Sequence, residues 1–386
     1  MVEEIRATPL KHRIRRILLS AISRVPVRQQ KPDTKQRVLL VRPDHLGDVL
    51  LTTPAIHALR AAIPNTEIHA LVGPWSASVL ANYSEIDVIL TLPFPGFTRN
   101  RKHNLLAPYT LVWQSARHLR AIGYSHAFIL RPDHWWGALM AYLARIPERV
   151  GFDLPDVAPF LTCRVPPEHG HVIIGNLRLM EQGMDIAAAK AIRYQLNISR
   201  DDRHYISQYL ESRGVNPQQR VFCIHPGSGA SIKNWCPTRW AEVADRLIDQ
   251  LAAQAVVTGG SHEMPLVQGI IAQMAHSAHN LAGKTGIGQL GALYARSCVV
   301  IGPDSGPLHL AAAVGTPTVA LFGPADPDQF APWGSDEKHI VLTTTIKCRP
   351  CGILDWGNDD PKYHPCVRDI GIQEICDAAG HVTKLR

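Results

Sequence analysis

Residues 298–323, CVVIGPDSGPLHLAAAVGTPTVALFG, limit the possible fold more than any other stretch of the chain. The apolar run 299–301 predicts a buried strand, and the polar turn Asp304-Ser305-Gly306 follows it. The small residues 308–314 predict a helix, and the apolar run 318–322 predicts a second strand. Strand, turn, helix and strand in this order form the repeating unit of a parallel α/β sheet.

The turn at 304–306 would lie at the carboxyl end of its strand, where open α/β sheets bind ligands. Its hydroxyl group and backbone N–H groups would meet a helix N-terminus, which suits an anion such as a diphosphate. The alternative is that Asp304 or Ser305 only caps the helix. This stretch alone does not decide between the two interpretations.

The composition is that of a soluble globular protein, with 46% hydrophobic and 19% charged residues among 386. That length accommodates two domains, each with its own core. No apolar run approaches the ~18 residues of a membrane-spanning helix, and no convincing signal peptide is found. We therefore expect a cytoplasmic protein whose eight cysteines stay reduced.

The positive charge is concentrated at the N-terminus. Residues 1–37 contain ten Lys and Arg but three Asp and Glu, which accounts for the whole formal net charge of +7. The remaining chain is balanced, so no nucleic-acid partner is expected. An apolar stripe runs at helical spacing from Leu10 to Val25. A basic amphipathic helix predicts a peripheral contact with a membrane surface. The alternatives are an ordinary docking helix or a solvated tail.

Alternating strands and helices predict two Rossmann-like domains. After a basic tail at 1–36, we expect an N-terminal domain at 37–200 and a C-terminal domain at 201–386. The strands predicted for the first are 37–42, 67–72, 88–92 and 126–130, with helices at 48–62, 75–82, 111–122 and 135–144. Between 153 and 217 the pattern loosens and predicts no strong strand. The strands predicted for the second domain are 221–225, 255–258, 280–282, 299–301 and 318–322.

Two further polar turns follow strands of the second domain. One contains Gly227 and Ser228, with Lys233 shortly after, and the other ends at Glu263. Neither is a Walker A loop or a GxGxxG fingerprint, and each alone would be ordinary α/β turn chemistry. Glycine allows close backbone approach, a lysine can neutralise a diphosphate, and Glu263 can accept hydrogen bonds from a ribose. Because three such turns would share one sheet edge, together they predict nucleotide binding.

Asp48 is the candidate catalytic residue of the first domain. It follows the strand 37–42 in the sequence Asp44-His45-Leu46-Gly47-Asp48, close to a predicted helix N-terminus. A carboxylate there can act as a general base. The alternative is a helix N-cap, which is a common role for aspartate.

Together these motifs resemble glycosyltransferase family 9, which includes the ADP-heptose:lipopolysaccharide heptosyltransferases. The matching segments are 38–60 (VLLVRPDHLGDVLLTTPAIHALR), 145–153, 223–247, 256–263 (VVTGGSHE), 280–290, 301–327 and 332–334. The resemblance implies the GT-B architecture, in which two Rossmann-like domains face each other across a cleft. It also implies inverting sugar transfer, with the acceptor on the N-terminal domain and the nucleotide-sugar donor on the C-terminal one.

The resemblance assigns a role to each candidate residue. Asp48 matches the family's general base, Lys233 the lysine that contacts the donor phosphates, and Glu263 the acid near the nucleoside. The diphosphate-binding turn corresponds to Asp304, Ser305, Gly306 and His309, and Gly227 and Ser228 complete the donor site. The expected donor is an ADP-linked heptose and the expected acceptor a lipopolysaccharide-core glycolipid.

An inverting transfer needs a base on the acceptor hydroxyl and charge stabilisation at the departing diphosphate. Lys233 and a helix dipole can supply the second, so no cofactor is expected. Cys348, Cys351, Cys366 and Cys376 could hold a structural Zn or Fe. Their spacing is irregular and Cys376 falls in a predicted helix, so we predict no metal site. The alternative functions are a nucleotide-sugar epimerase on the same scaffold and a non-catalytic nucleotide-sugar-binding protein.

Overall fold

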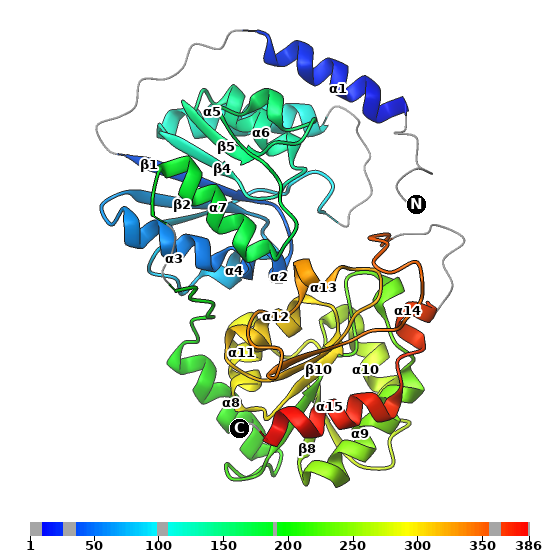
Figure 1. The fold of residues 1–386 in the computed structure, drawn as a ribbon. Coiled ribbons are helices and arrows are strands. Elements are labelled where there is room, and N and C mark those ends of the chain that lie inside the picture. Colours follow the sequence, from blue (N-terminus) through cyan, green and yellow to red (C-terminus); the bar gives the residue numbers. More distant parts are fainter. Residues whose placement is uncertain (1–9, 26–35, 99–106, 188–190, 355–363, 385–386) are drawn as a thin grey trace. The chain divides into compact units, whose positions relative to one another are not determined.

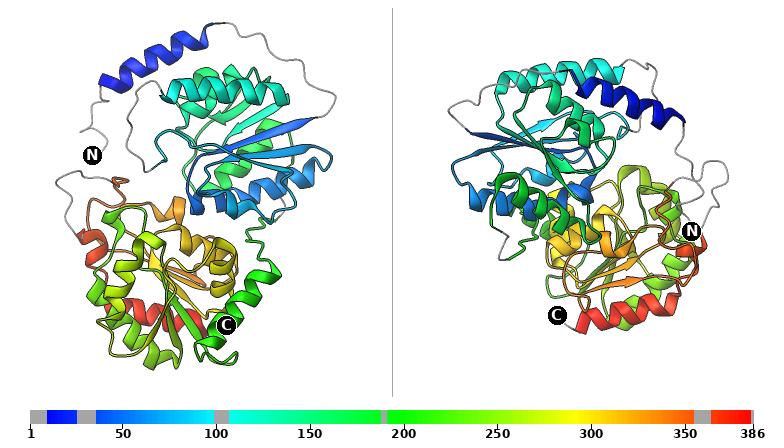
Figure 2. Two further views of the ribbon diagram at one scale, coloured as in Figure 1. Left: turned by 180° about the vertical axis from the view of Figure 1, so that it is seen from behind. Right: turned by 45° about the horizontal axis from the view of Figure 1, so that its top comes forward.

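A computed structural model describes residues 10–25, 36–98, 107–187, 191–354 and 364–384. The chain divides into two compact units, unit 1 (1–193) and unit 2 (194–386), each built around a six-stranded parallel sheet. Figures 1 and 2 show helices on both faces of each sheet. The predicted α/β class with two Rossmann-like domains is confirmed.

Unit 1 has the strand order β3-β2-β1-β4-β5-β6, so the chain order reverses between β1 and β4. Val41 of β1 pairs with Ile129 of β4 at this reversal. The strands are β1 (Arg37–Arg42), β2 (Glu67–Val72), β3 (Val88–Thr91), β4 (His126–Ile129), β5 (Glu148–Phe152) and β6 (Cys163–Val165). The helices are α1 (Leu10–Ser23), α2 (Leu46–Leu50), α3 (Thr53–Ala62), α4 (Ala77–Leu80), α5 (Ala107–Ile122), α6 (Trp135–Leu143), η2 (Ala158–Phe160) and α7 (Val172–Met184).

Unit 2 repeats this topology with the order β12-β11-β10-β7-β8-β9, and its reversal lies between β7 and β10. The strands are β7 (Val221–Ile224), β8 (Gln254–Val257), β9 (Ala278–Asn280), β10 (Val300–Pro303), β11 (Thr318–Leu321) and β12 (His339–Leu342). The helices are α8 (Arg200–Ser212), η3 (Ser231–Lys233), α9 (Pro237–Leu251), η4 (Ser261–Glu263), α10 (Met264–Ile271), α11 (Ile287–Arg296), α12 (Gly306–Ala313), α13 (Pro327–Phe330), α14 (Pro365–Arg368) and α15 (Ile372–Lys384).

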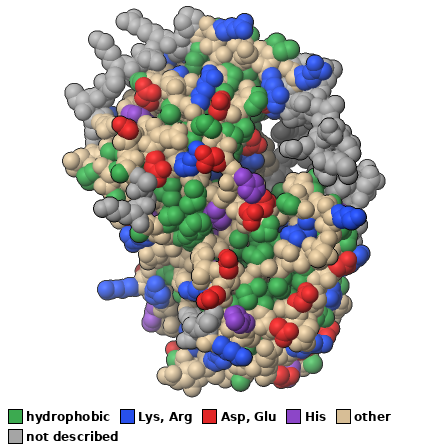
Figure 3. Space-filling view, viewed as in Figure 1, with side chains coloured by type: hydrophobic (Ala, Val, Ile, Leu, Met, Phe, Trp, Pro, Cys, Tyr) green, Lys and Arg blue, Asp and Glu red, His purple; other side chains and the backbone are tan. Residues whose placement is uncertain are grey.

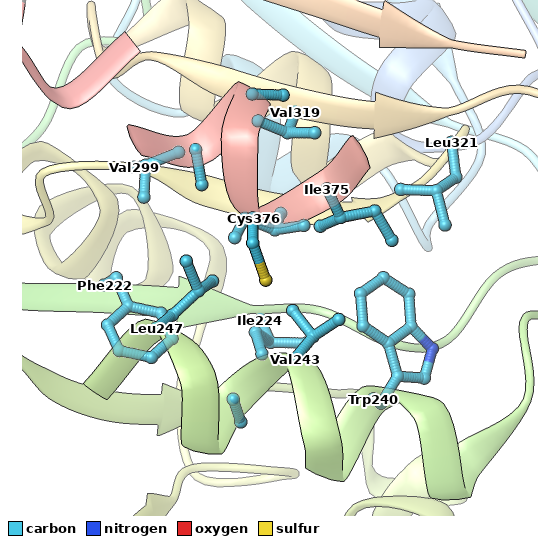
Figure 4. Packing of buried hydrophobic residues seen from close by; sticks show 14 of the residues in the cluster. Phe222, Ile224, Trp240, Val243, Leu247, Val299, Val319, Leu321, Ile375 and Cys376 are labelled. Carbon is cyan, nitrogen blue, oxygen red and sulfur yellow. The ribbon is translucent and has the colours of Figure 1, made fainter. Parts of the chain in front are cut away.

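Each unit has its own apolar core, because strands of a parallel sheet are covered on both faces. In unit 2, Trp240, Val243 and Leu247 of α9 pack against the sheet and against Cys376 of α15 (Figure 4). The central strands β1 and β7 are almost entirely apolar and buried. Apart from Arg37 at the start of β1, their polar groups lie at or directly after the carboxyl ends, so the candidate site of each unit forms at that edge.

Several local predictions are wrong, and strands β5 and β12 have no counterpart among the predicted strands. The single helix expected over 48–62 is two helices, α2 and α3, which break at Leu51-Thr52. Pro54 has no N–H to donate to the Leu50 carbonyl, which instead accepts a hydrogen bond of 2.8 Å from the Thr53 hydroxyl. The helix expected over 75–82 is the single turn α4. The region 153–217 does contain a strand, β6, which is short and lies at the sheet edge.

Candidate active site

Arg42 joins the two strands at the reversal point of unit 1. It is 4% exposed, and its Nη1 donates to the carbonyl of Leu130, directly after β4, at 2.5 Å. Its Nε lies 2.7 Å from Asp44 Oδ2, and its Nη2 donates to Asp48 Oδ1 at 3.2 Å. One buried guanidinium therefore fixes both carboxylates of the loop after β1.

Asp44 is the buried centre of this network. Its side chain is 2% exposed and forms ion pairs with Arg42 and with Arg131, which follows β4. Burial alone would raise the pKa of Asp44, but Arg42 and Arg131 outweigh it and hold the pKa below the ordinary value. Its backbone carbonyl also accepts hydrogen bonds from Trp75 Nε1 at 3.0 Å and Ser76 Oγ at 3.1 Å, which follow β2. Groups at or after the carboxyl ends of three neighbouring strands thus hold this loop.

Asp48 lies in the first turn of α2, where the helix dipole favours a negative charge. Residue His45 occupies the N-cap position, so the alternative that Asp48 is the N-cap does not hold. The side chain of Asp48 is 36% exposed. Burial by the surrounding protein raises its pKa above the ordinary value, although Arg42 opposes the shift and Asp44 adds to it. A raised pKa makes this carboxylate a stronger base than an ordinary aspartate.

The structure adds three residues that the sequence analysis missed: Arg131, Asp133 and His134. Arg131 pairs with Asp133 at 2.6 Å as well as with Asp44. His134 is 5% exposed, and neither of its ring nitrogens has a hydrogen-bond partner within the described part of the chain. Burial lowers the pKa of His134 to about 3, so the ring is neutral.

A repeated tetrapeptide was the available signal for these residues. Arg-Pro-Asp-His occurs at 42–45 and again at 131–134, each time where a predicted strand ends. The topology places the two copies side by side, because β1 and β4 are neighbours. The two copies supply both partners of the Asp44–Arg131 ion pair.

In unit 2, the three polar turns follow β7, β8 and β10, which are neighbours in the sheet. The structure therefore brings the predicted donor-site residues to one edge. Lys233 Nζ donates to Asp304 Oδ2 at 2.5 Å, and the two side chains are 17% and 7% exposed. An ammonium group has three donors, so this pair orients Lys233 and leaves N–H groups for another acceptor.

Glu263 closes over the glycine-rich turn after β7. Its Oε2 accepts a hydrogen bond of 2.6 Å from the Gly260 N–H and lies 3.6 Å from His225 Nε2. A Cβ on Gly227 would lie 1.9 Å from Glu263 Oε1, so only glycine fits this position without displacing the carboxylate. Burial lowers the pKa of His225 to about 4, which leaves that ring neutral; it pairs with Thr258 Oγ1 at 3.0 Å.

The remaining predicted donor residues have different surroundings. The Ser228 hydroxyl is within donating distance of the Ala230 carbonyl at 2.7 Å and of Asn234 Oδ1 at 2.8 Å, so it shapes its own loop. Ser305 occupies the N-cap position of α12 without a side-chain capping bond, and its buried Oγ has no hydrogen-bond partner among the residues described. Gly306 begins α12, and His309 is buried within it at 5% exposure. Simple capping by Asp304 or Ser305 therefore does not explain this turn.

The four C-terminal cysteines have separate environments. Cys376 is buried in the core of unit 2, as Figure 4 shows, whereas Cys348 is exposed. Burial raises the pKa of the Cys366 thiol, and Cys348 and Cys351 add to the shift. In the ranges that the structure describes, no three of these cysteines bring their sulfur atoms within 4.8 Å of one another.

A membrane-spanning helix is not found among the described residues, because none of their helices is both long and apolar enough.

Comparison with known proteins identifies clear relatives. A family model described as glycosyltransferase family 9 (heptosyltransferase) matches residues 112–353. Lipopolysaccharide heptosyltransferase 2 of Escherichia coli K12 is 25% identical over 362 residues, which cover 88% of this chain and 97% of that protein.

Solved structures are similar along most of the chain. The glycosyl transferase family 9 protein from Veillonella parvula DSM 2008 superposes with a TM-score of 0.77 at 25% identity, covering 93% of this chain and all (100%) of that chain. The E. coli heptosyltransferase WaaC, solved with ADP-2-deoxy-2-fluoro heptose, superposes with a TM-score of 0.62 at 19% identity, covering 80% and 93%.

Proposed function

Because this chain belongs to glycosyltransferase family 9, we propose that it transfers a heptose from ADP-heptose to a lipopolysaccharide-core acceptor, with inversion at the anomeric carbon. The name of the E. coli relative supports the sugar and the acceptor. The heptose analogue bound to WaaC supports an ADP-linked donor.

The observation that carries this proposal is the setting of Asp48. Its carboxylate is partly exposed, is oriented by Arg42 and has a raised pKa. In the proposed step, the acceptor hydroxyl oxygen attacks the anomeric carbon while its proton passes to Asp48. The bond from the anomeric carbon to the diphosphate oxygen breaks, and ADP leaves with the electron pair.

Unit 2 supplies the groups that would hold the donor. Lys233, oriented by Asp304, would neutralise the diphosphate together with the N-terminus of α12 at Gly306. The Glu263 carboxylate would accept hydrogen bonds from the ribose, and Gly227 leaves it the space to do so. This scheme stabilises the leaving group without a metal or another cofactor.

The proposal extends to the domains and the location. The acceptor would bind the N-terminal domain, 37–200, and the donor the C-terminal domain, 201–386. A glycolipid acceptor is inserted in a membrane, so we place the enzyme in the cytoplasm, peripherally on the inner face of the inner membrane. Membership of the transferase family favours this function over an epimerase or a binding protein. An epimerase would change the sugar without an acceptor, and a binding protein would leave the donor intact.

The test is Asp48→Asn, which keeps the shape of the side chain but cannot take up the proton. Heptose transfer should fall by about 10²-fold or more. Binding of ADP-heptose, measured by calorimetry, should stay unchanged because the proposed donor residues belong to unit 2. Turnover close to that of the unmodified enzyme would exclude Asp48 as the base.

A further inference from the structure

Helix α1 contacts the rest of unit 1 through the side that carries Arg15, Arg16 and Leu19. Arg15 and Arg16 both form ion pairs with Asp156, the second at 2.5 Å. Between them and the helix end, Leu19 is 4% exposed and joins the core of unit 1. The Tyr142 hydroxyl donates to the carbonyl of Ser23 at 3.3 Å. The helix is therefore anchored, and its anchors lie on one side.

Four apolar side chains of the stripe that the structure describes lie away from these anchors and are exposed. Ile17 is 70% exposed, Leu18 58%, Ile22 39% and Val25, just beyond the helix, 60%. At 3.6 residues per turn these positions lie within about 140° of one another, and their centre is roughly opposite Arg16, with Ile22 nearest to Leu19. An amphipathic helix docked only for stability would bury this stripe. The orientation found here instead leaves these four side chains exposed, where a ligand outside the chain can contact them.

Helix α5 also exposes two aromatic side chains. Tyr109 and Trp113 of α5 are 58% and 55% exposed. The consecutive residues Trp135 and Trp136 begin α6 and connect the two helices. The Arg15 guanidinium lies 5.3 Å from the ring centroid of Trp135, and Trp136 Nε1 donates to the carbonyl of Pro108 in α5 at 3.1 Å. Both helices thus adjoin the start of α6 (Figure 1).

The positive charge of α1 and α5 favours an anionic ligand. Neither α1 nor α5 contains an acidic residue, and their basic residues with described side chains are Arg13, Arg15, Arg16, Arg117 and Arg120. Figure 3 shows basic and hydrophobic side chains next to each other at the top of the view, where Figure 1 draws α1. A second copy of the chain would bring like charges together. Anionic lipid attracts each nearby basic side chain by about 1 kcal/mol, and Trp and Tyr favour the headgroup region.

We propose that the α1 face, defined as Ile17, Leu18, Ile22, Val25, Tyr109 and Trp113, inserts into the headgroup region of an anionic bilayer. Since α1 is anchored to unit 1 through Asp156, binding gives this unit a fixed orientation on the lipid surface. The N-terminal segment is then a docked binding face, which differs from both a free tether and a helix buried for stability. This inference rests on the proposed function only in expecting a membrane-bound acceptor.

Co-sedimentation of the full-length protein with lipid vesicles tests the proposal. The vesicles contain phosphatidylglycerol and phosphatidylcholine in equal parts, with pure phosphatidylcholine as the comparison. Ile17→Ser combined with Leu18→Ser should lower the partition coefficient by about 10-fold or more, because both side chains would be buried on binding. The matched single variants are Ile22→Ser and Ile174→Ser, since both isoleucines are 39% exposed. Only the first should weaken binding.

Two further readouts separate the possible failures. Circular dichroism and transfer to a soluble, deacylated acceptor should not change in these variants, so a loss of vesicle binding cannot come from misfolding or from a lost active site. Equal binding by the Ile22→Ser and Ile174→Ser variants would overturn the proposal. A second result would also overturn it: sedimentation equilibrium shows that the unmodified chain is a dimer and the double variant a monomer, while the double variant binds vesicles as well as the unmodified chain.

Discussion

Replacing Asp44 by asparagine removes the negative charge at the centre of the unit 1 network. The side chain is 2% exposed and its partner Arg42 is 5% exposed, so the guanidinium would stay buried with Asp48 as its remaining carboxylate. Breaking one partner out of a buried ion pair costs about 3–5 kcal/mol. The pair with Arg131, whose side chain is 35% exposed, adds little. Since asparagine keeps the shape and one acceptor, we expect a loss of roughly 3 kcal/mol.

Hydrogen exchange measured by mass spectrometry reports this loss for each unit separately. Peptides covering β1 and β4 should exchange about 100-fold faster in Asp44→Asn, because each 1.36 kcal/mol corresponds to a factor of ten. Peptides covering β7 and β10 in unit 2 serve as the internal reference. Asp133→Asn is the matched control, since Asp133 also pairs with Arg131 but is 66% exposed. It should change exchange only a few-fold, at less than about 1 kcal/mol.

The stabilisation that the Asp44 carboxylate provides should depend on pH in one direction. Because the folded-state pKa of Asp44 lies below the ordinary value, its stabilisation is complete above the unfolded pKa and is lost as the pH falls through the folded one. The difference between the unmodified protein and Asp44→Asn should therefore shrink in acid. Equal exchange rates in Asp44→Asn and Asp133→Asn at neutral pH would refute the argument.

The remaining predictions concern ligand binding and catalysis. Lys233→Ala should weaken ADP binding about 10- to 100-fold, the equivalent of ~1.5–3 kcal/mol, with adenosine unaffected; equal weakening of both in calorimetry would make Lys233 structural. Gly227→Ala should weaken adenosine binding about tenfold by displacing Glu263, whereas Gly229→Ala, whose Cβ would meet no atom within 4 Å, should not; identical affinities would contradict this steric argument. Because the pKa of Asp48 is raised, kcat should decline in acid with an apparent pKa above that of an ordinary aspartate. An apparent pKa at or below that of an ordinary aspartate would argue against Asp48 as the base.

Sequence reasoning predicts the strands with strong apolar runs and the polar turns that follow them. It predicts the shared edge of β7, β8 and β10, because alternating strands and helices form a parallel sheet, whose strands all end at the same edge. It misses β5 and β12. It also misses β6, which has three residues and lies at the sheet edge, since so short a segment has no periodicity to recognise. It also misses the break before α3, where one proline removes a single hydrogen bond.

Side-chain pairing is the part that the sequence does not show. Asp44 and Arg131 are far apart in the chain and meet only because the strand order reverses between β1 and β4. Lys233 and Asp304 meet in the same way across β7 and β10. The apolar periodicity of α1 is visible in the sequence, but which side of the helix faces unit 1 depends on Asp156 and on the core around Leu19.

The most direct measurement is a transfer reaction with purified protein, ADP-heptose and a lipopolysaccharide core that lacks heptose, followed by NMR of the product. The account predicts that ADP and the heptosylated core form in equal amounts and that the new glycosidic bond has the inverted anomeric configuration. Retention of configuration would contradict the single displacement with Asp48 as base. Release of ADP without sugar transfer, or a changed sugar without acceptor, would contradict the proposed reaction itself.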